Sequence, residues 1–266
     1  MQYSTFAAID IGSYDVILEI FEISKKQGIR SVDKICHRME LGKDTYTLGK
    51  IRPEMEEELC RVLADFVRIM EGYRVDAYRA MASSAISEAA NSLYVLGKIR
   101  QLTGLSVTVL SNSEQRFLGY KALAAMEDNF NKIIEKGTAI LDLDGGSFQI
   151  SLFDKDALVT TQNIRMGSLR IRERLAGIQS ETEHYEEMVE ELIWNEVSSF
   201  KKMYLKDRKI ENIMLIGDVF TDSVYQNIEE KTTKIISREN FNTWYEKIIR
   251  QSPICLLYTS PSPRDA

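Results

Sequence analysis

Alternating apolar and polar positions dominate the first forty residues of the chain and predict three β-strands. Val16, Leu18 and Ile20 show this alternation clearly, and a glycine–serine turn comes shortly before them. The three strands are expected at Phe6–Ile11, Asp15–Ile23 and Gly28–Leu41. The pattern therefore predicts a fold that begins with β-structure.

A helical pattern begins at Pro53, whose fixed φ angle suits the first position of a helix. The apolar residues of one helix face are Met55, Leu59, Val62, Phe66 and Met70. The elements expected next are a strand at Asp76–Ala82, a helix at about Ala85–Leu102 that Gly104 ends, a strand at Leu105–Leu110 and a helix at about Ser113–Met126. Three strands followed by alternating helices and strands are typical of ribonuclease-H-like folds.

The same pattern then starts again. The expected elements are strands at Thr138–Asp142, Phe148–Phe153 and Ala157–Ile164, a helix at about Glu183–Tyr204, a strand at Asn212–Ile216 and a last helix capped by Ser237. We therefore expect an α/β protein with two ribonuclease-H-like lobes, each a mixed sheet flanked by helices, and a cleft between them. The lobes are expected at residues 1–126 and 127–252.

The two halves begin with similar hairpins. Each hairpin has an apolar strand ending in an aspartate, a turn rich in glycine and serine, and a second strand; the aspartates, Asp10 and Asp142, are 132 positions apart. Glycine lets backbone N–H groups converge on an anion, and an aspartate beside such a turn can hold Mg²⁺ near a phosphate. The repeat predicts phosphate binding where the hairpins face each other; the alternative is that both aspartates only cap turns.

Composition narrows the class of protein. Acidic residues outnumber basic ones by 40 to 34, a formal charge of −6, which argues against a nucleic-acid polymer as partner. No apolar run approaches the roughly 20 residues of a membrane span, and the N-terminus lacks the pattern of a secretory signal. Three cysteines without CxxC spacing favour reduced thiols in the cytoplasm, and two histidines disfavour a zinc site or a Ser/His triad.

The last residues differ in character from the rest. The string CLLYTSPSPRDA, Cys255–Ala266, holds two of the four prolines, has no helical or strand period, and looks like translated adapter or vector sequence. We expect residues 253–266 to be a non-native or disordered tail and the second lobe to be truncated. An ordinary disordered tail is the alternative.

Five segments in order carry a resemblance to a known family. They read AAIDIGS, MASSAISEAAN, VLSNSEQRFLGYKAL, AILDLDGGSFQISLF and IRMGSLRIRERL, and the resemblance covers about residues 5–220. They resemble the exopolyphosphatase and guanosine pentaphosphate phosphohydrolase (Ppx/GppA) family of the actin-like superfamily. The resemblance implies two actin-like lobes that hold a polyphosphate or a phosphorylated nucleotide, a divalent cation such as Mg²⁺, and hydrolysis of the terminal phosphoric anhydride.

The resemblance also implies roles for individual residues. The phosphate-binding residues it implies are Gly12, Ser13, Gly145, Gly146, Ser147, Arg165, Gly167 and Arg170, and Asn91 also lies on a matching position. The metal ligands it implies are Asp10 and Asp142. The catalytic positions are Glu114, Gln115, Asp142 and Gln149.

Several positions depart from the family pattern. The departures are Tyr14-Asp15 in place of Asn-Ser in the first turn, Ser87 in place of a basic residue, Asp144 within the glycine run, and Gln115 and Gln149 in place of glutamates. A neutral amide cannot take a proton from water, and losing a general base typically costs roughly 10²–10⁴-fold in rate. A glutamine can still orient water in phosphoryl transfer. Glu114 could substitute as the base, or it is only a first-turn carboxylate that favours the helix dipole.

These observations give three hypotheses. The leading one is a metal-dependent phosphohydrolase that releases terminal phosphate from polyphosphate or pentaphosphate nucleotides, with activity weakened by the glutamines. The second is a non-catalytic polyphosphate or nucleotide sensor. The third is an ATP-dependent kinase of the same superfamily, which the motifs after both hairpins disfavour. No membrane partner is expected, and a homodimer is left open.

Overall fold

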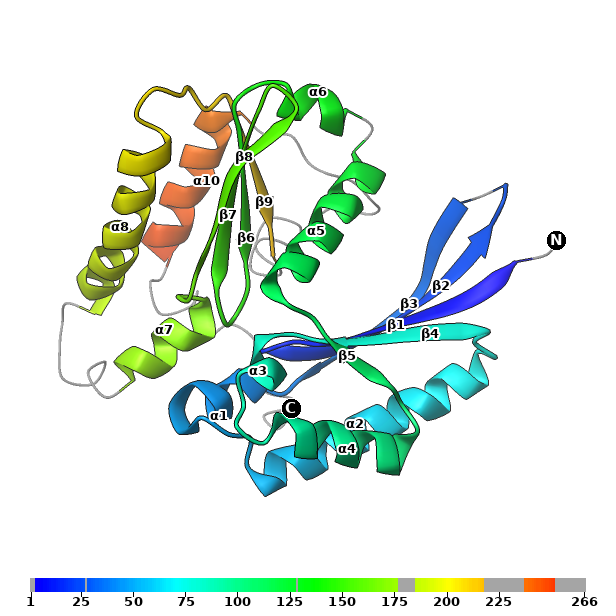
Figure 1. Cartoon of the computed structure of the whole chain (residues 1–266). Coiled ribbons are helices and arrows are strands. Elements are labelled where there is room, and N and C mark those ends of the chain that lie inside the picture. The colour runs from blue at the N-terminus through cyan, green and yellow to red at the C-terminus, as the bar shows by residue number, and fades with distance from the viewer. Residues whose placement is uncertain (1–2, 27, 128, 177–184, 218–236, 252–266) are drawn as a thin grey trace. The chain divides into compact units, whose positions relative to one another are not determined.

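The computed structural model describes residues 3–26, 28–127, 129–176, 185–217 and 237–251. Within these ranges the chain forms two compact units (Figure 1). The first unit takes residues from 1–120, 144–148 and 165–174, and the second takes residues from 121–143, 149–164 and 175–266. The first unit is thus assembled from three separate parts of the sequence.

The first unit contains a five-stranded mixed sheet. Its strands are β1 (Ser4–Ile11), β2 (Asp15–Ser24), β3 (Gly28–Arg38), β4 (Ala77–Ala82) and β5 (Val107–Val109), in the order β3-β2-β1-β4-β5. The first three strands pair antiparallel, whereas β4 runs parallel to β1 and to β5. This topology confirms the expected ribonuclease-H-like order. The third strand is shorter than predicted, because Glu40 adopts a left-handed φ of 50° and starts a helix that the sequence pattern did not predict.

Five helices begin within residues 1–120 of the first unit. They are α1 (Leu41–Leu48), α2 (Pro53–Gly72), α3 (Ser84–Ser87), α4 (Ser92–Thr103) and α5 (Asn112–Met126). The single helix predicted over Ala85–Leu102 was wrong, since the structure has two, α3 and α4. The chain leaves the helical path between them, where the Ala90 N–H donates to the Gly49 carbonyl over 2.9 Å. The side chain of Asn91 fixes this break by bonding both backbone groups of Ile51.

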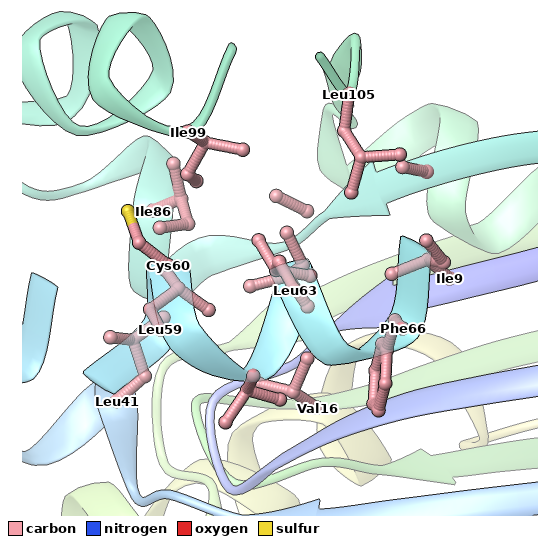
Figure 2. Close-up of a cluster of buried hydrophobic side chains, with 14 of the residues drawn as sticks. Ile9, Val16, Leu41, Leu59, Cys60, Leu63, Phe66, Ile86, Ile99 and Leu105 are labelled. Carbon is pink, nitrogen blue, oxygen red and sulfur yellow. The ribbon is translucent and has the colours of Figure 1, made fainter. Parts of the chain in front are cut away.

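The core of the first unit lies between its sheet and α2. Leu59, Leu63 and Phe66 of α2 are buried, and Figure 2 shows them beside Ile9 of β1 and Val16 of β2. The predicted apolar face of α2 is confirmed. Burying such side chains contributes about 1.5–3 kcal/mol each, which anchors α2 and fixes β1 at the centre of the unit.

The second unit repeats the pattern with a four-stranded sheet. Its strands are β6 (Thr138–Leu143), β7 (Phe148–Asp154), β8 (Ala157–Ile164) and β9 (Asn212–Ile216), in the order β8-β7-β6-β9. The other helices of the described residues are α7 (Ser168–Leu175), which begins in the first unit, and α6 (Phe130–Ile134), α8 (Tyr185–Tyr204) and α10 (Arg238–Gln251). Figure 1 shows α8 and α10 on one side of this sheet. The predicted cap of the last helix is confirmed, because the Asn240 N–H donates to Ser237 Oγ over 3.1 Å.

Two expectations concern the end of the chain: a non-native or disordered tail and a truncated second lobe. The tail Cys255–Ala266 lies outside the described residues, so its nature stays a prediction. Among the strands described, β9 is at the sheet edge, and Ile213 is 62% exposed there. Within the described ranges, no helix is long and apolar enough to cross a membrane.

Candidate functional site

The turn between β1 and β2 is the first part of the site. The Gly12 N–H donates to the Asp15 carbonyl over 2.9 Å, and a β-carbon on Gly12 would lie 2.9 Å from that oxygen. Ser13 follows and is fully buried. The Ser83 N–H donates to the Ile11 carbonyl over 3.2 Å, so the turn lies at the carboxyl ends of the parallel strands β1 and β4. Ligands bind preferentially outside the carboxyl ends of strands in α/β sheets.

Three hydroxyl groups meet at this turn. Tyr46 of α1 places its hydroxyl 2.7 Å from Ser13 Oγ and 2.8 Å from Ser84 Oγ of α3, and the two serine oxygens are 3.3 Å apart. Burial is the main cause that raises the pKa of Tyr46, so its hydroxyl stays protonated at neutral pH. We call Ser13, Tyr46 and Ser84 the hydroxyl trio. Sequence reasoning missed both Tyr46, which no motif marks, and Ser84, which lies in the segment MASSAISEAAN but was given no role.

The second glycine turn packs against the hydroxyl trio within the first unit. The Asp144 N–H donates to the Ser147 carbonyl over 3.0 Å and closes this turn. A β-carbon on Gly146 would lie 2.5 Å from Ser84 Oγ and would also overlap the Tyr46 hydroxyl. A β-carbon on Gly145 would lie 3.3 Å from Ser13 Cβ. The structure therefore brings both predicted glycine turns to Ser13, and a β-carbon at position 146 would overlap two of the three hydroxyls.

The start of α7 holds the second glycine turn in place. The Ser168 and Arg170 N–H groups donate to the carbonyls of Asp144 and Gly145 over 3.3 and 3.1 Å. A β-carbon on Gly167 would overlap the backbone of the same turn. The predicted residues Gly145, Gly146, Ser147, Gly167 and Arg170 thus form one packed group.

Arg170 connects the parts of the site. Its Nε donates to the Gly146 carbonyl over 2.9 Å, and its guanidinium lies 3.8 Å from the centre of the Tyr46 ring. Its Nη2 also pairs with Glu88 over 3.0 Å, and Arg165 pairs with the other oxygen of Glu88 over 3.2 Å. Arg165 and Arg170 therefore share one carboxylate, and Arg165 is largely exposed. Sequence reasoning did not single out Glu88.

A second arginine network lies at the edge of the site. Arg172 makes a two-pronged pair with Glu40, over 2.9 and 2.7 Å, and also contacts Glu173. The hydrogen bond from Arg172 is the largest cause that lowers the pKa of Glu40. Beside it the Arg38 guanidinium lies 3.9 Å from the centre of the Tyr14 ring, and burial is the main cause that raises the pKa of Tyr14. The charges of Arg38 and Arg172 are balanced by Glu40 and Glu173, and the pair of Arg172 with Glu40 ties α7 to the start of α1.

The two aspartates proposed as metal ligands belong to different units. Asp10 is an exposed residue of β1, on the opposite face from the buried Ile9 and Ile11, and Asp142 is a half-buried residue of β6. Their placement across a common cleft stays a prediction. Among the residues that the structure describes, no group of three or more His, Cys, Asp or Glu side chains could hold a metal ion.

Glu114 caps the helix on which it lies. Its Oε2 accepts from the backbone N–H and the hydroxyl of Ser111 over 2.9 and 2.7 Å, and its own N–H donates to Ser111 Oγ over 3.2 Å. These bonds lower the pKa of Glu114. This reciprocal arrangement is a capping box at the start of α5. The geometry matches the structural alternative for Glu114, and the half-buried Gln115 follows it on the same helix.

Gln149 and Asn91, two further residues that the resemblance singles out, differ in their hydrogen bonds. Gln149 of β7 is buried, and its Oε1 has no hydrogen-bond partner. An unpaired buried acceptor costs about 1–3 kcal/mol, so this oxygen is available to a donor or a cation. Asn91 instead bonds Ile51 and the buried Glu56, whose carboxylate it meets over 2.9 Å. Its contacts are structural.

Proteins with related sequences support a phosphatase family. The chain is 22% identical over 238 residues to a bifunctional 3-dehydroquinate synthase/phosphatase of Fusobacterium nucleatum, covering 85% of this chain and 34% of that protein. It is 26% identical over 144 residues to exopolyphosphatase 1 of Mycobacterium leprae, covering 54% of this chain and 41% of that protein. The chain therefore spans only about a third to two fifths of the length of these curated relatives.

Solved structures support the fold. A Ppx/GppA family member from Aquifex aeolicus matches with a TM-score of 0.70 and 21% identity, covering 94% of this chain and 80% of that one. An exopolyphosphatase from Cytophaga hutchinsonii matches with a TM-score of 0.75 and 18% identity, covering 93% and 80%. These likenesses confirm the expected α/β fold, which the chain shares with the Ppx/GppA structures. Residues 19–253 match the sequence model of the Ppx/GppA phosphatase family, and the chain belongs to that family.

Proposed function

We propose that the protein is a phosphohydrolase that releases terminal phosphate from inorganic polyphosphate or from a nucleotide polyphosphate. One observation carries the proposal: the Gly12-Ser13 and Gly145-Gly146 turns meet at Ser13, and Arg170 bonds the second turn directly. Membership of the Ppx/GppA phosphatase family supports the same reaction class. The glycines of both turns carry no side chain, which lets backbone N–H groups approach an anion, as phosphate binding requires.

Arg165 and Arg170 supply the positive charge of the proposed site. Guanidinium groups bind phosphate oxygens in the same two-pronged geometry in which they bind carboxylates. Both arginines already share the carboxylate of Glu88, which keeps their side chains beside the second turn. A phosphate chain that enters the site would exchange this carboxylate for its own oxygens.

A divalent cation, Mg²⁺, is part of the proposal. Asp142 and the unpaired Oε1 of Gln149 are oxygen ligands on β6 and β7, neighbouring strands of the second unit, and Asp10 is the carboxylate proposed from the first unit. Mg²⁺ is usually held by one or two protein carboxylates together with substrate phosphates, so this sparse donor set fits it. When bound, the cation would neutralise charge on the phosphate oxygens.

We propose that hydrolysis is slow. Gln115 and Gln149 cannot accept a proton from water, and the Glu114 carboxylate is engaged in the helix cap. Without a general base the rate is expected to fall by roughly 10²–10⁴-fold. The engaged Glu114 also favours a second candidate, a protein that binds polyphosphate or nucleotide without hydrolysing it.

The test compares release with binding. Phosphate release from long-chain polyphosphate and from a pentaphosphate nucleotide is measured with Mg²⁺, beside a calorimetric binding isotherm for each ligand. Slow release above the buffer rate, together with binding, supports the phosphohydrolase. Tight binding without release supports the binding protein. If the protein shows no binding and no release, both proposals are refuted.

A further inference from the structure

Tyr46 contacts several groups of the proposed phosphate site, yet the proposed function gives it no role. Its hydroxyl bonds Ser13 and Ser84, and its ring lies under the Arg170 guanidinium. Gly146 packs against the same hydroxyl. Gly42, one turn earlier in α1, also packs against the ring, since a β-carbon there would lie 2.6 Å from Tyr46 Cε2. The side chain is therefore enclosed by the groups that are expected to hold phosphate.

The position of the Tyr46 hydroxyl matters most. It bonds Ser13 Oγ and Ser84 Oγ, and a β-carbon on Gly146 would overlap it, so it contacts both the Ser13 hydroxyl and the second glycine turn. A phosphoryl group that contacts both the Ser13 hydroxyl and the Gly146 backbone needs that same volume. Protein atoms and phosphate oxygens cannot overlap, so Tyr46 has to move its hydroxyl before such a contact forms.

Hydrogen-bond accounting supports the same conclusion. Each hydroxyl of the trio has one proton to donate. If each donates to the next in a closed cycle, all three protons are used within the trio. Ser13 and Ser84 can donate to a phosphate only when the trio opens. The neighbouring Ser83 Oγ is buried and has no hydrogen-bond partner, so an incoming anion would offer an acceptor that the protein does not.

We propose that Tyr46 sets the phosphate affinity of the site by competing with the terminal phosphoryl group for Ser13 and Ser84. In the closed arrangement its hydroxyl occupies the anion position, and phosphate binding displaces it. The ring keeps its place beside Arg170, which holds that guanidinium next to Gly146. This proposal rests on the proposed function and adds a residue that determines how strongly the phosphate end is held.

The experiment removes the competing hydroxyl and keeps the ring. Tyr46→Phe in the full chain is titrated calorimetrically with short-chain inorganic polyphosphate and Mg²⁺. Displacing the hydroxyl no longer costs a hydrogen bond, so binding is expected to tighten about three- to tenfold. Tyr73→Phe is the matched control: its hydroxyl donates to Asp33 over 2.8 Å in the same unit, away from the trio, and its removal should leave the affinity unchanged.

Unchanged or weaker binding by Tyr46→Phe overturns the proposal, since weaker binding means that the hydroxyl contacts the ligand favourably. A second measurement does not depend on the mutant. With 3-fluorotyrosine at position 46, the ¹⁹F resonance should shift on addition of polyphosphate and saturate with the binding isotherm. Binding without that shift overturns the role of Tyr46 and leaves the proposed function intact. No binding by the wild-type chain refutes the proposed function, and the role of Tyr46 with it.

Discussion

Individual glycines and hydroxyls decide what the site can hold. The turn pattern alone predicted Gly12, Gly145 and Gly146, because glycine-rich turns after apolar strands are a local signal. Tyr46 and Ser84 could not be predicted in this way. Their contacts with Ser13 join residues 33 and 71 positions away in the sequence, and such contacts exist only after the sheet and helices have formed.

The glutamines make a prediction at the residue scale. The double change Gln115→Glu and Gln149→Glu should raise polyphosphate hydrolysis by about one to several orders of magnitude, on the order of a general-base contribution. Mg²⁺ dependence should sharpen, because a carboxylate at position 149 is a better ligand than an amide. Polyphosphate affinity should stay the same or fall slightly, since two added negative charges repel a polyanion.

Steady-state phosphate release at several Mg²⁺ concentrations checks this prediction. A double mutant slower than the wild type would mean that the glutamines orient water in a different arrangement. In that case Glu114→Gln should remove the remaining activity, whereas the capping box observed at Glu114 predicts mainly a loss of helix stability.

At the scale of elements, the helices and strands with a clear hydrophobic period were the ones predicted correctly. All nine strands of the described residues match predicted strands to within a few positions, and α2 begins at Pro53 as expected. The eight-residue α1 was missed, because its sequence LGKDTYTL has too few apolar positions to show a helical period. It begins after the left-handed Glu40, which no local motif predicts.

The break between α3 and α4 depends on Asn91, which gives a second prediction. Asn91→Ala should lower the free energy of unfolding by about 1–3 kcal/mol, because Ile51 loses its partners and the buried Glu56 loses a donor. Gln101→Ala, at an exposed position of α4, should change stability by no more than about 0.5 kcal/mol. Urea unfolding of both variants measures the difference. Equal stability would mean that the break is fixed by the backbone alone.

At the scale of the whole molecule, the sequence repeat predicted two lobes, but not which segments pack together. Residues 144–148 and 165–174 belong to the same compact unit as residues 1–120. The ion pair of Arg172 with Glu40 joins positions 132 apart in the sequence. The charges near Glu40 or near Arg172 alone do not predict this pair. Hydrophobic periodicity predicts which face of a helix or strand is buried, but it does not predict which other element packs against that face.

This long-range pair predicts a pH dependence. Arg172 lowers the pKa of Glu40 in the folded protein, so the pair stabilises the fold above the unfolded pKa of about 4.3 and loses this effect as pH falls through the lower folded value. Arg172→Ala should therefore be less stable than the wild type at pH 7, and the difference should shrink below about pH 4. Chemical unfolding across this pH range measures it. A difference independent of pH would assign the loss to packing alone.

The central claim is that the two glycine turns at Ser13 hold the phosphate, and binding by Gly146→Ala tests it most directly. A β-carbon at this position overlaps the Tyr46 hydroxyl and Ser84 Oγ, so the added methyl group would fill the volume in which a phosphoryl group could contact Ser13 and the Gly146 backbone. Gly97→Ala, where a β-carbon meets no neighbouring atom within 4 Å, is the control. Calorimetric titration with inorganic polyphosphate and Mg²⁺ should show binding at least about tenfold weaker for Gly146→Ala, a loss of roughly 1.4 kcal/mol or more, and unchanged for Gly97→Ala. Equal affinity in a folded Gly146→Ala protein would show that the phosphate is held elsewhere.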